Sequence, residues 1–230
     1  MHEIRAVILD FDGLIVDTET PVFEAWREAY RQRGHELGLD EWQHALGTHH
    51  GFDPLARLEE LVGAGLQREE VQVEVKAASG RGCEGQPLLP GVASLLREAR
   101  RLGLGRAVAS SSSRGWVDGW LRRHGIRDLL DVVVGRDDVA RVKPDPELFL
   151  LAASRLAQDP GACLVFEDSP NGIRAAREAS MRCVAVPNAL TRQLELPEVD
   201  LVIGSLDERP LLAILEALAT EPARLPGGQR

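Results

Sequence analysis

Two aspartates separated by one residue, Asp10 and Asp12, follow the short apolar run Arg5–Leu9. On extended backbone, side chains two residues apart point to the same side, so both carboxylates can face one pocket. Carboxylates that close repel each other and raise each other's pKa, and a divalent cation removes this penalty. Hard carboxylate oxygens suit Mg²⁺. The pair therefore indicates a magnesium site, the alternative being a solvated turn with capping acids.

A second acidic pair, Glu167 and Asp168, follows the apolar run Cys163–Phe166. Taken alone, this pair is equally well explained as the cap of the helix that follows it. If the two acidic pairs lie at the same edge of a sheet, four carboxylates meet there, which is costly without a cation. The two pairs together favour a metal site over a simple cap.

A serine and a lysine could bind phosphate beside these acids. Ser110 ends the apolar run Gly105–Ala109, and a hydroxyl followed by free backbone N–H groups at a helix start forms a phosphate cradle. Lys143 lies in a segment that Pro144 and Pro146 keep extended before a helix, where its charge could neutralise phosphate. The alternatives are a flexible serine loop and an ordinary surface lysine.

The elements that must position these residues alternate between short apolar runs and amphipathic segments. The runs are Arg5–Leu9, Gly105–Ala109, Asp131–Val134, Cys163–Phe166, Cys183–Val186 and Leu201–Ile203, and the helical segments are Val92–Leu102, Gly115–His124, Pro146–Ala157 and Asn171–Ser180. This alternation predicts a doubly wound, Rossmann-like α/β fold with a parallel sheet covered on both faces. Ligands of such sheets bind at the carboxyl ends of the strands, where the acids, Ser110 and the 137–138 acid pair should converge.

The interval between the first two strands is too long for one crossover and is helical in pattern. Helices are expected at Pro21–Arg33, Asp40–Leu46, Pro54–Ala64 and Arg68–Ser79. The sequence thus predicts a catalytic core formed by residues 1–17 and 86–220, with an inserted helical domain at residues 18–85. Residues 221–230 contain two prolines and two glycines and are expected to be a frayed, flexible tail.

The composition narrows the class of protein. The chain has 230 residues, of which 44% are hydrophobic and 27% charged, as in soluble globular proteins. A net charge of -9 argues against binding nucleic acid or an anionic membrane. The absence of a membrane-length apolar run, of a signal peptide and of paired cysteine motifs favours a cytoplasmic protein. We expect a monomer whose partner is a small phosphorylated metabolite.

Four motifs in this order give the chain a family resemblance. They are Asp10-Phe11-Asp12-Gly13, the strand ending at Ser110, Lys143-Pro144-Asp145-Pro146 and Phe166-Glu167-Asp168-Ser169-Pro170-Asn171-Gly172. The chain resembles the phosphatase and phosphomutase branch of the haloacid dehalogenase superfamily as far as about Ala219. The helical insert is similar to that family's small cap domain.

The resemblance implies a division of roles. Asp10 would attack phosphorus and form an aspartyl-phosphate, while Asp12 would protonate the leaving oxygen and then activate water. The implied ligands of Mg²⁺ are Asp10, Asp12 through its backbone carbonyl, Glu167 and Asp168, and the implied phosphate-binding groups are Ser110, the Ser111 amide and Lys143. Substrate specificity would come from contacts in the cap and beside it, for which the candidates are Glu19, Trp26, His49, His50, Lys76 and Arg114.

The leading hypothesis is a Mg²⁺-dependent phosphatase that hydrolyses a small phosphomonoester, such as a sugar phosphate. The dehalogenases of the superfamily lack an acid at the position of Asp12. A hexose-phosphate mutase similar to β-phosphoglucomutase is the first alternative, but those mutases place a histidine and an arginine where this chain has Val22 and His50. The second alternative is a phospho-accepting receiver domain, a signalling module without turnover, which carries no helical cap.

Overall fold

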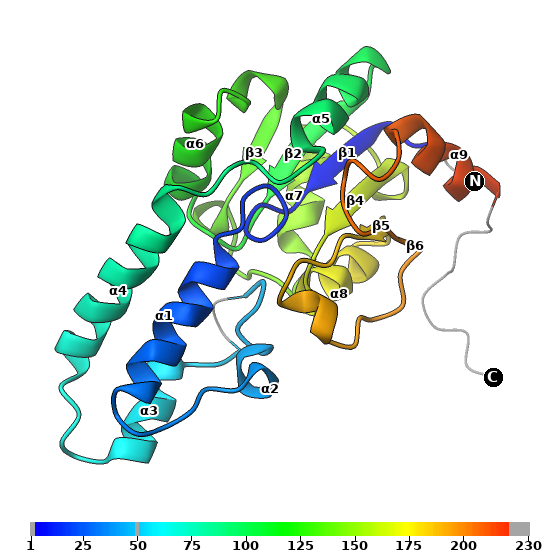
Figure 1. Cartoon of the computed structure of the whole chain (residues 1–230). Helices are drawn as coiled ribbons and strands as arrows, with labels where there is room; N and C mark the ends of the chain where they lie inside the picture. The colour runs from blue at the N-terminus through cyan, green and yellow to red at the C-terminus, as the bar shows by residue number, and fades with distance from the viewer. Residues whose placement is uncertain (1–2, 49–50, 221–230) are drawn as a thin grey trace, which may run out of the picture.

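The computed structural model describes residues 3–48 and 51–220, and it contains one parallel sheet in that part of the chain (Figure 1). The strands are β1 (Ala6–Leu9), β2 (Gly105–Ala109), β3 (Val132–Val134), β4 (Cys163–Glu167), β5 (Arg182–Ala185) and β6 (Leu201–Val202). Their order in the sheet is β3-β2-β1-β4-β5-β6, and every neighbouring pair is parallel. The predicted Rossmann-like α/β fold is confirmed, and the strand that leads to Asp10 lies at its centre.

Helices cover both faces of this sheet. They are α5 (Val92–Arg101), α6 (Arg114–Arg123), α7 (Glu147–Arg155), α8 (Pro170–Glu178) and α9 (Leu211–Thr220). Side chains of β1 alternate between the faces: Val7 and Leu9 belong to the core cluster shared with α5, α6 and α9, and Ala6 and Ile8 to the one shared with α7 and α8. Because both faces are covered, every residue of β1 is fully buried, which explains its continuous apolar sequence.

Helix α9 was not predicted from the sequence. Its leucines and alanines form a nearly continuous apolar run, so the stretch has no clear polar face that would mark a helix. In the structure, Leu211, Ile214 and Leu218 are buried in the same core cluster as α5. Tertiary packing therefore explains this helix better than its local pattern does.

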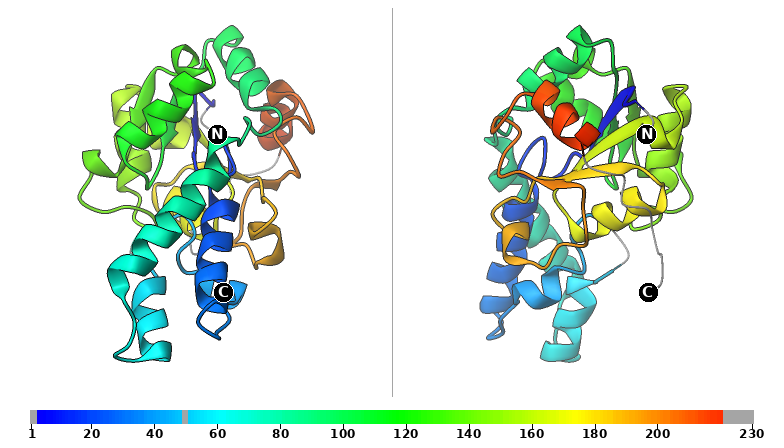
Figure 2. Two further views of the ribbon diagram at one scale, coloured as in Figure 1. Left: turned by 60° about the vertical axis from the view of Figure 1, so that its left-hand side comes forward. Right: turned by 90° about the vertical axis from the view of Figure 1, so that its right-hand side faces the viewer.

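Four helices lie between β1 and β2: α1 (Glu19–Arg31), α2 (Leu39–Trp42), α3 (Pro54–Val62) and α4 (Arg68–Glu84). They extend together from one end of the sheet (Figure 2). These helices share a hydrophobic cluster of their own, which includes Phe23, Tyr30 and Leu58 and which Leu190 of the core also joins. The helical character expected for this interval is therefore present.

Two of these helices differ in length from the sequence prediction. Helix α2 ends at Trp42 instead of Leu46, whereas α4 continues past Ser79 to Glu84. The extra turn of α4 contains two glycines, Gly80 and Gly82, which have a low helix propensity. A Cβ on Gly82 would lie 2.8 Å from the Cβ of Pro21 in α1, so a small residue is needed where these helices approach each other.

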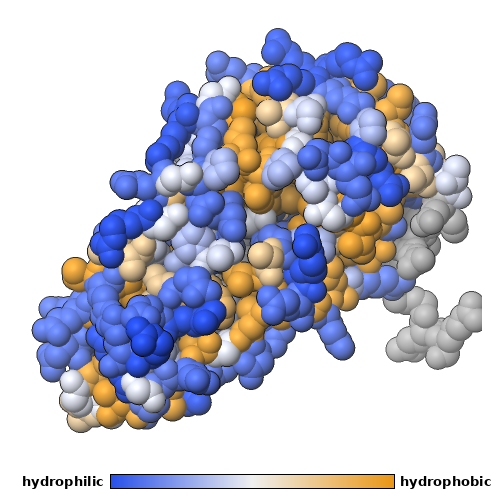
Figure 3. Space-filling model, viewed as in Figure 1, coloured by the Kyte–Doolittle hydropathy of each residue, from blue (hydrophilic) through white to orange (hydrophobic). Residues whose placement is uncertain are grey.

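The outer surface is mostly polar around the four inserted helices, and apolar side chains gather nearer the middle of the same view (Figure 3). None of the helices in the described part of the chain is both long enough and apolar enough to cross a membrane.

Candidate active site

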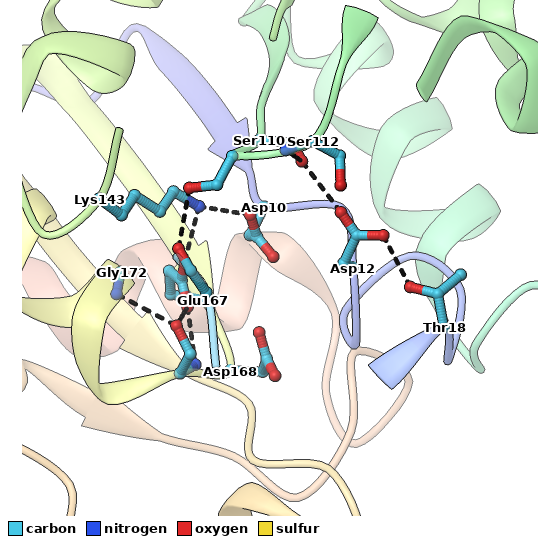
Figure 4. Close-up of polar contacts among 12 residues, drawn as sticks. Asp10, Asp12, Thr18, Ser110, Ser112, Lys143, Glu167, Asp168 and Gly172 are labelled. Atoms are coloured by element: carbon cyan, nitrogen blue, oxygen red, sulfur yellow. Dashed lines mark hydrogen bonds and ion pairs between the residues drawn. The ribbon is translucent and has the colours of Figure 1, made fainter. Parts of the chain in front are cut away.

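The carboxyl ends of three adjacent strands bring the predicted residues together (Figure 4). Asp10 follows β1, Ser110 follows β2 and Glu167 ends β4, and β1 lies between the other two strands. Leu9 pairs with Val108 on one side and with Phe166 on the other, so the three polar side chains start from nearly the same level. The convergence expected from the strand-end rule is thus observed for these three residues. The expectation was wrong for Asp137 and Asp138, which instead accept hydrogen bonds from the backbone nitrogen of Arg114 and the guanidinium of Arg155 and do not line the cavity at this end of the sheet.

Lys143 is fully buried between two carboxylates. Its Nζ donates a very short hydrogen bond to Asp10 Oδ1 and lies 2.7 Å from Glu167 Oε1. The same ammonium group lies 4.7 Å from the centre of the Phe149 ring. Burial lowers the pKa of Lys143, but the two carboxylates more than offset this and raise it above its ordinary value. Lys143 is therefore a charged component of the site and not a surface lysine.

Asp10, Glu167 and Asp168 form a buried acidic cluster in which one oxygen from each carboxylate lies within 4.8 Å of the others. Burial raises the pKa of Asp10 to about 7, despite the opposing charge of Lys143. Burial, followed by the charges of Glu167 and Asp10, also raises the pKa of Asp168 well above its ordinary value. Asp10 and Asp168 are thus held where their ionisation is unfavourable without additional positive charge.

One fully buried oxygen of this cluster has no hydrogen-bond partner among the described residues. Asp168 Oδ2 accepts a 2.7 Å hydrogen bond from Asn188 Nδ2, whereas Asp168 Oδ1 is buried and unpartnered. A buried carboxylate oxygen without a partner is costly, and a hard divalent cation would satisfy it. The donor set therefore fits the Mg²⁺ expected from the sequence.

Glu167 is fixed in place by the start of α8. Its Oε2 accepts hydrogen bonds from the backbone nitrogen and the hydroxyl of Ser169, at 2.7 and 3.0 Å. Ser169 in turn caps α8 by accepting from the nitrogen of Gly172. A Cβ on Gly172 would lie 1.9 Å from Glu167 Cδ, so only glycine leaves room for this carboxylate. The cap expected from the sequence and the acidic cluster therefore occur together.

Asp12 lies beside the acidic cluster and accepts three hydrogen bonds. Its Oδ1 accepts from Thr18 Oγ1 at 2.7 Å and from Trp116 Nε1 at 3.1 Å, and its Oδ2 accepts from Ser110 Oγ at 3.0 Å. The Asp12 carboxylate is not part of the cluster formed by the other three acids. The environments of the two aspartates therefore differ: Asp10 is paired with an ammonium group, and Asp12 with neutral donors.

The serine run forms the turn that leads into α6. Ser110 Oγ accepts from the nitrogen of Ser112 at 2.9 Å, and Ser113 caps the helix. Ser111 is nearly buried, and its hydroxyl donates to the backbone oxygen of Gly47 in the inserted segment at 2.8 Å. This stretch is an ordered turn before a helix, not a flexible serine loop.

A cavity of about 450 Å³ separates this end of the sheet from the inserted helices. Asp10, Asp12, Ser110 and Ser111 contribute to its lining. Glu19, a predicted specificity residue, also lines it, and burial together with the charges of Asp12 and Asp10 raises its pKa well above the ordinary value. A substrate bound here would touch both the sheet end and the inserted segment.

The remaining specificity candidates lie in different places. Trp26 lines the cavity. Lys76 is exposed on α4. The Arg114 guanidinium lies 3.8 Å from carboxylate oxygens of Asp118 and Asp138. Neither cation is among the residues that line the cavity. His49 and His50 lie outside the described residues.

Sequence reasoning missed three side chains that contact the predicted site: Thr18, Trp116 and Asn188. Asn188 follows β5 closely, so the same strand-end rule that selected the acids could have pointed to it. The indole of Trp116 and the hydroxyl of Thr18 carry no comparable signal, because both come from segments whose approach to Asp12 depends on the tertiary fold.

Comparisons with known proteins agree with this arrangement. Residues 4–180 match the family described as haloacid dehalogenase-like hydrolase. The protein YhcW of Bacillus subtilis is 42% identical over 95% of this chain and 99% of its own, and hexitol phosphatase A of Escherichia coli is 31% identical over 89% and 92%. A crystal structure of a CbbY variant from Rhodobacter sphaeroides with xylulose 1,5-bisphosphate is 31% identical, covers 89% of this chain and 96% of its own, and has a TM-score of 0.70. With its fold, its site and these matches in agreement, this chain belongs to the haloacid dehalogenase-like hydrolase family.

Proposed function

We propose that the protein is a Mg²⁺-dependent phosphatase that hydrolyses a small phosphomonoester through an aspartyl-phosphate. The observation that carries this proposal is the acidic cluster of Asp10, Glu167 and Asp168, which holds one buried ammonium group and one unpartnered carboxylate oxygen. Asp10 also lines the cavity between the sheet and the inserted helices. A carboxylate, local positive charge and room for an ester are thus present at one place.

The first step is attack of an Asp10 carboxylate oxygen on the phosphorus of the ester. The new O–P bond gives the aspartyl-phosphate, and the bond between phosphorus and the leaving oxygen breaks. Asp12 donates a proton to that oxygen, so that the product leaves as an alcohol. The three hydrogen bonds to Asp12 from Thr18, Trp116 and Ser110 hold its carboxyl group in a defined orientation for this transfer.

In the second step, water attacks the phosphorus of the aspartyl-phosphate. Asp12, which has lost its proton, accepts one from this water, and the bond between Asp10 and phosphorus breaks. Inorganic phosphate is released, Asp10 is restored as a carboxylate, and Asp12 is protonated again. The two acids therefore return to their starting states after one ester has been hydrolysed.

Asp10, Glu167 and Asp168, with the backbone carbonyl of Asp12, would hold the Mg²⁺. When bound, this cation supplies positive charge that offsets the negative charge of the phosphoryl group and of the attacking carboxylate. Lys143 contributes further positive charge beside Asp10. The phosphoryl oxygens are assigned to the Ser110 hydroxyl, the Ser111 amide and Lys143.

The helical segment at residues 18–85 is proposed to act as a cap. It supplies one wall of the cavity and limits the access of bulk water, which strengthens electrostatic interactions in the site. Among the hydrogen bonds that connect it to the core are those from Ser111 Oγ to Gly47 O and from Asn171 Nδ2 to Leu46 O, each 2.8 Å long. The cytoplasmic location and the monomeric state expected from the sequence remain predictions.

The relatives support a phosphorylated sugar or polyol as substrate, because one is named for a hexitol and another was crystallised with a sugar bisphosphate. Hydrolysis is favoured over a mutase because Val22, which replaces the mutase histidine, is an apolar residue in the wall of the cavity. Without a group that holds a second phosphorylated sugar intermediate in the site, water is the acceptor of the phosphoryl group.

The test is phosphate release from a panel of sugar phosphates and other monoesters, with Mg²⁺ and with EDTA. We expect activity that EDTA abolishes and excess Mg²⁺ restores. Asp10→Asn should lose that activity while it keeps the circular dichroism of the wild type. Asp128→Asn, which changes an exposed aspartate outside the site, is the matched control and should remain active. An Asp10→Asn protein that turns over normally would rule out the proposed nucleophile.

A further inference from the structure

Building on the proposed function, we propose that the preferred substrates carry one phosphate on an otherwise uncharged molecule with an apolar face. Sugar or polyol monophosphates meet this description, whereas bisphosphates and phosphorylated carboxylic acids do not. The inference rests on the side chains that surround the part of the cavity away from Asp10.

One part of the cavity lining is aromatic and apolar. Its members come from the inserted segment and from α6: Val22, Trp26, Trp42, Phe52, Pro54 and Trp116. Aromatic rings in a ligand cavity offer broad apolar surfaces against which the C–H face of a sugar or another apolar surface packs. The leaving group is therefore expected to bury an apolar face here.

Among the residues that the structure describes, the ionisable side chains in the lining of the cavity are all acidic. Its lining includes Asp10, Asp12, Glu19 and Asp53 but, among the residues that the structure describes, no lysine, arginine or histidine. Asp53 Oδ1 already accepts hydrogen bonds from two backbone nitrogens at the start of α3. Glu19, whose pKa is raised by burial and by the nearby charges of Asp12 and Asp10, and Asp53 can form hydrogen bonds with hydroxyl groups, whereas the acidic lining is unfavourable for a second anion.

The lysines and the arginine that the sequence analysis selected either form ion pairs with other acidic side chains or lie exposed to solvent. Lys143 lies between Asp10 and Glu167. Arg114 faces Asp118 and Asp138, and Lys76 is exposed on α4. A second phosphate or a carboxylate in the cavity would therefore lose its hydration without gaining a counter-ion from these side chains, which is strongly unfavourable.

This lining should make the chain a poor enzyme for a substrate such as the bisphosphate bound by the CbbY variant of Rhodobacter sphaeroides. Proteins with similar folds can thus differ in whether they bind a substrate that carries a second charged group. That group would contact side chains of the inserted segment and not the acidic cluster.

The first experiment compares matched esters that differ only in the second group. 2-Hydroxyethyl phosphate is paired with 2-phosphoglycolate, and a hexitol monophosphate is paired with its bisphosphate. We expect kcat/KM to be at least about tenfold higher for the uncharged member of each pair, as like-charge juxtaposition is costly. Equal values, or a preference for the charged member, would overturn the inference.

p-Nitrophenyl phosphate distinguishes a failure of the proposed phosphatase activity from a failure of the proposed substrate preference. If it is hydrolysed in a Mg²⁺-dependent manner while charged esters are preferred, the proposed function stands and the inference about the substrate is wrong. If no ester of the panel, including p-nitrophenyl phosphate, is hydrolysed, the proposed function itself fails and the inference falls with it.

A pair of variants tests the wall directly. Val22→Arg places a cation in the lining of the cavity, whereas Val73→Arg places the same group on α4, where Val73 is 69% exposed. Val22→Arg should raise the ratio of kcat/KM for the charged member to that for the uncharged member about tenfold. Val73→Arg should leave the ratio unchanged, and a ratio that responds equally to both variants would contradict the assignment of this wall.

A binding measurement supplies a readout without turnover and without a new arginine. Three of the four tryptophans, Trp26, Trp42 and Trp116, line the cavity, so ligand binding should change the intrinsic fluorescence. In the Asp10→Asn protein with Mg²⁺, 2-hydroxyethyl phosphate should bind at least about tenfold more tightly than 2-phosphoglycolate. Equal or reversed affinities would overturn the inference even if Val22→Arg failed to fold.

Discussion

Asn188 Nδ2 donates a 2.7 Å hydrogen bond to Asp168 Oδ2 and thereby fixes the carboxylate whose other oxygen has no partner. The same amide group also donates a 3.3 Å hydrogen bond to the backbone oxygen of Gly13, the last residue of the Asp10 motif. Asn188 thus connects the loop after β5 with both the first motif and the acidic cluster. Partners of this kind orient metal ligands and tune the affinity of a metal site.

Replacing Asn188 by alanine should therefore weaken Mg²⁺ binding. We expect the Mg²⁺ concentration needed for half-maximal activity to rise about 10-fold to 100-fold, the range found for partners of metal ligands. Activity at saturating Mg²⁺ should largely recover, and a metal titration of phosphate release measures both values. Gln193→Ala changes an exposed amide in the same loop and should leave the titration unchanged. An unaltered titration for Asn188→Ala would show that this amide does not support a metal site.

Trp116 should contribute to catalysis through its indole nitrogen and to substrate binding through its ring. Trp116→Phe removes the hydrogen bond to Asp12 but keeps an aromatic surface, so we expect kcat to fall about tenfold with little change in KM. Trp116→Ala removes the surface as well and should also raise KM. Steady-state kinetics of the two variants on one monoester separates these effects, and equal kinetic constants for both would contradict the division of roles.

Gly172→Ala should disturb the acidic cluster by displacing the Glu167 carboxyl group. The added Cβ would collide with the Glu167 carboxyl group, which must then move away from Lys143 or Ser169. We expect the free energy of unfolding to fall by about 1–3 kcal/mol, as for other overpacked sites, together with a loss of activity.

The matched control for that substitution is Gly119→Ala in α6. No atom lies within 4 Å of the Cβ that would be added there, so the helix should be stabilised by about 0.5–1 kcal/mol. Chemical denaturation of both variants gives the comparison. If both alanines had the same effect, steric pressure on Glu167 would not be the cause.

The chelated protein should become less stable as the pH rises from about 4 to about 7. Burial raises the pKa of Asp10 in the folded state to about 7 from an ordinary value of 3.8, so the folded state binds more protons in this interval. The stability that this proton contributes is fully present below the unfolded pKa and is lost as the pH passes through the folded pKa. Excess Mg²⁺ should have the opposite trend, because it binds the deprotonated carboxylates and stabilises the protein more at higher pH.

Thermal unfolding between pH 5 and 8, with EDTA and with Mg²⁺, measures this dependence. Asp10→Asn removes one of the titrating groups and should make the curve recorded in EDTA less steep, the rest of the slope coming from Asp168 and Glu19, whose pKa values are also raised. A wild-type curve in EDTA that matched that of Asp10→Asn would show that Asp10 does not titrate as its burial implies.

Much of the fold was predictable because its strands have a strong local signal. Both faces of the sheet are covered, so the strands are short apolar runs, and each carries its polar residues just beyond its end. The position of Asp10, Ser110 and Glu167 at one edge followed from this rule alone. Their contacts with Lys143 depend on a buried ammonium group that the sequence could not distinguish from a surface lysine.

The substrate side of the site was less predictable, because it depends on how the inserted helices pack. Glu19 and Trp26 line the cavity as expected. Lys76, however, is exposed to solvent on α4, and Arg114 lies near the carboxylates of Asp118 and Asp138. A charged residue near a motif in sequence says little about which side of its helix the tertiary contacts bury. The apolar character of the wall became evident only from the cavity itself.

Two of the hydrogen bonds between the inserted segment and the core are accepted by neighbouring carbonyl groups, those of Leu46 and Gly47. Their donors, Asn171 and Ser111, come from the segments after β4 and β2, which flank the central strand on either side. Leu46 and Gly47 are therefore hydrogen-bonded to core segments that lie on either side of Asp10. A movement of residues 46–47 away from the core would break both hydrogen bonds, so it would also release the hydroxyl of Ser111, which borders the cavity.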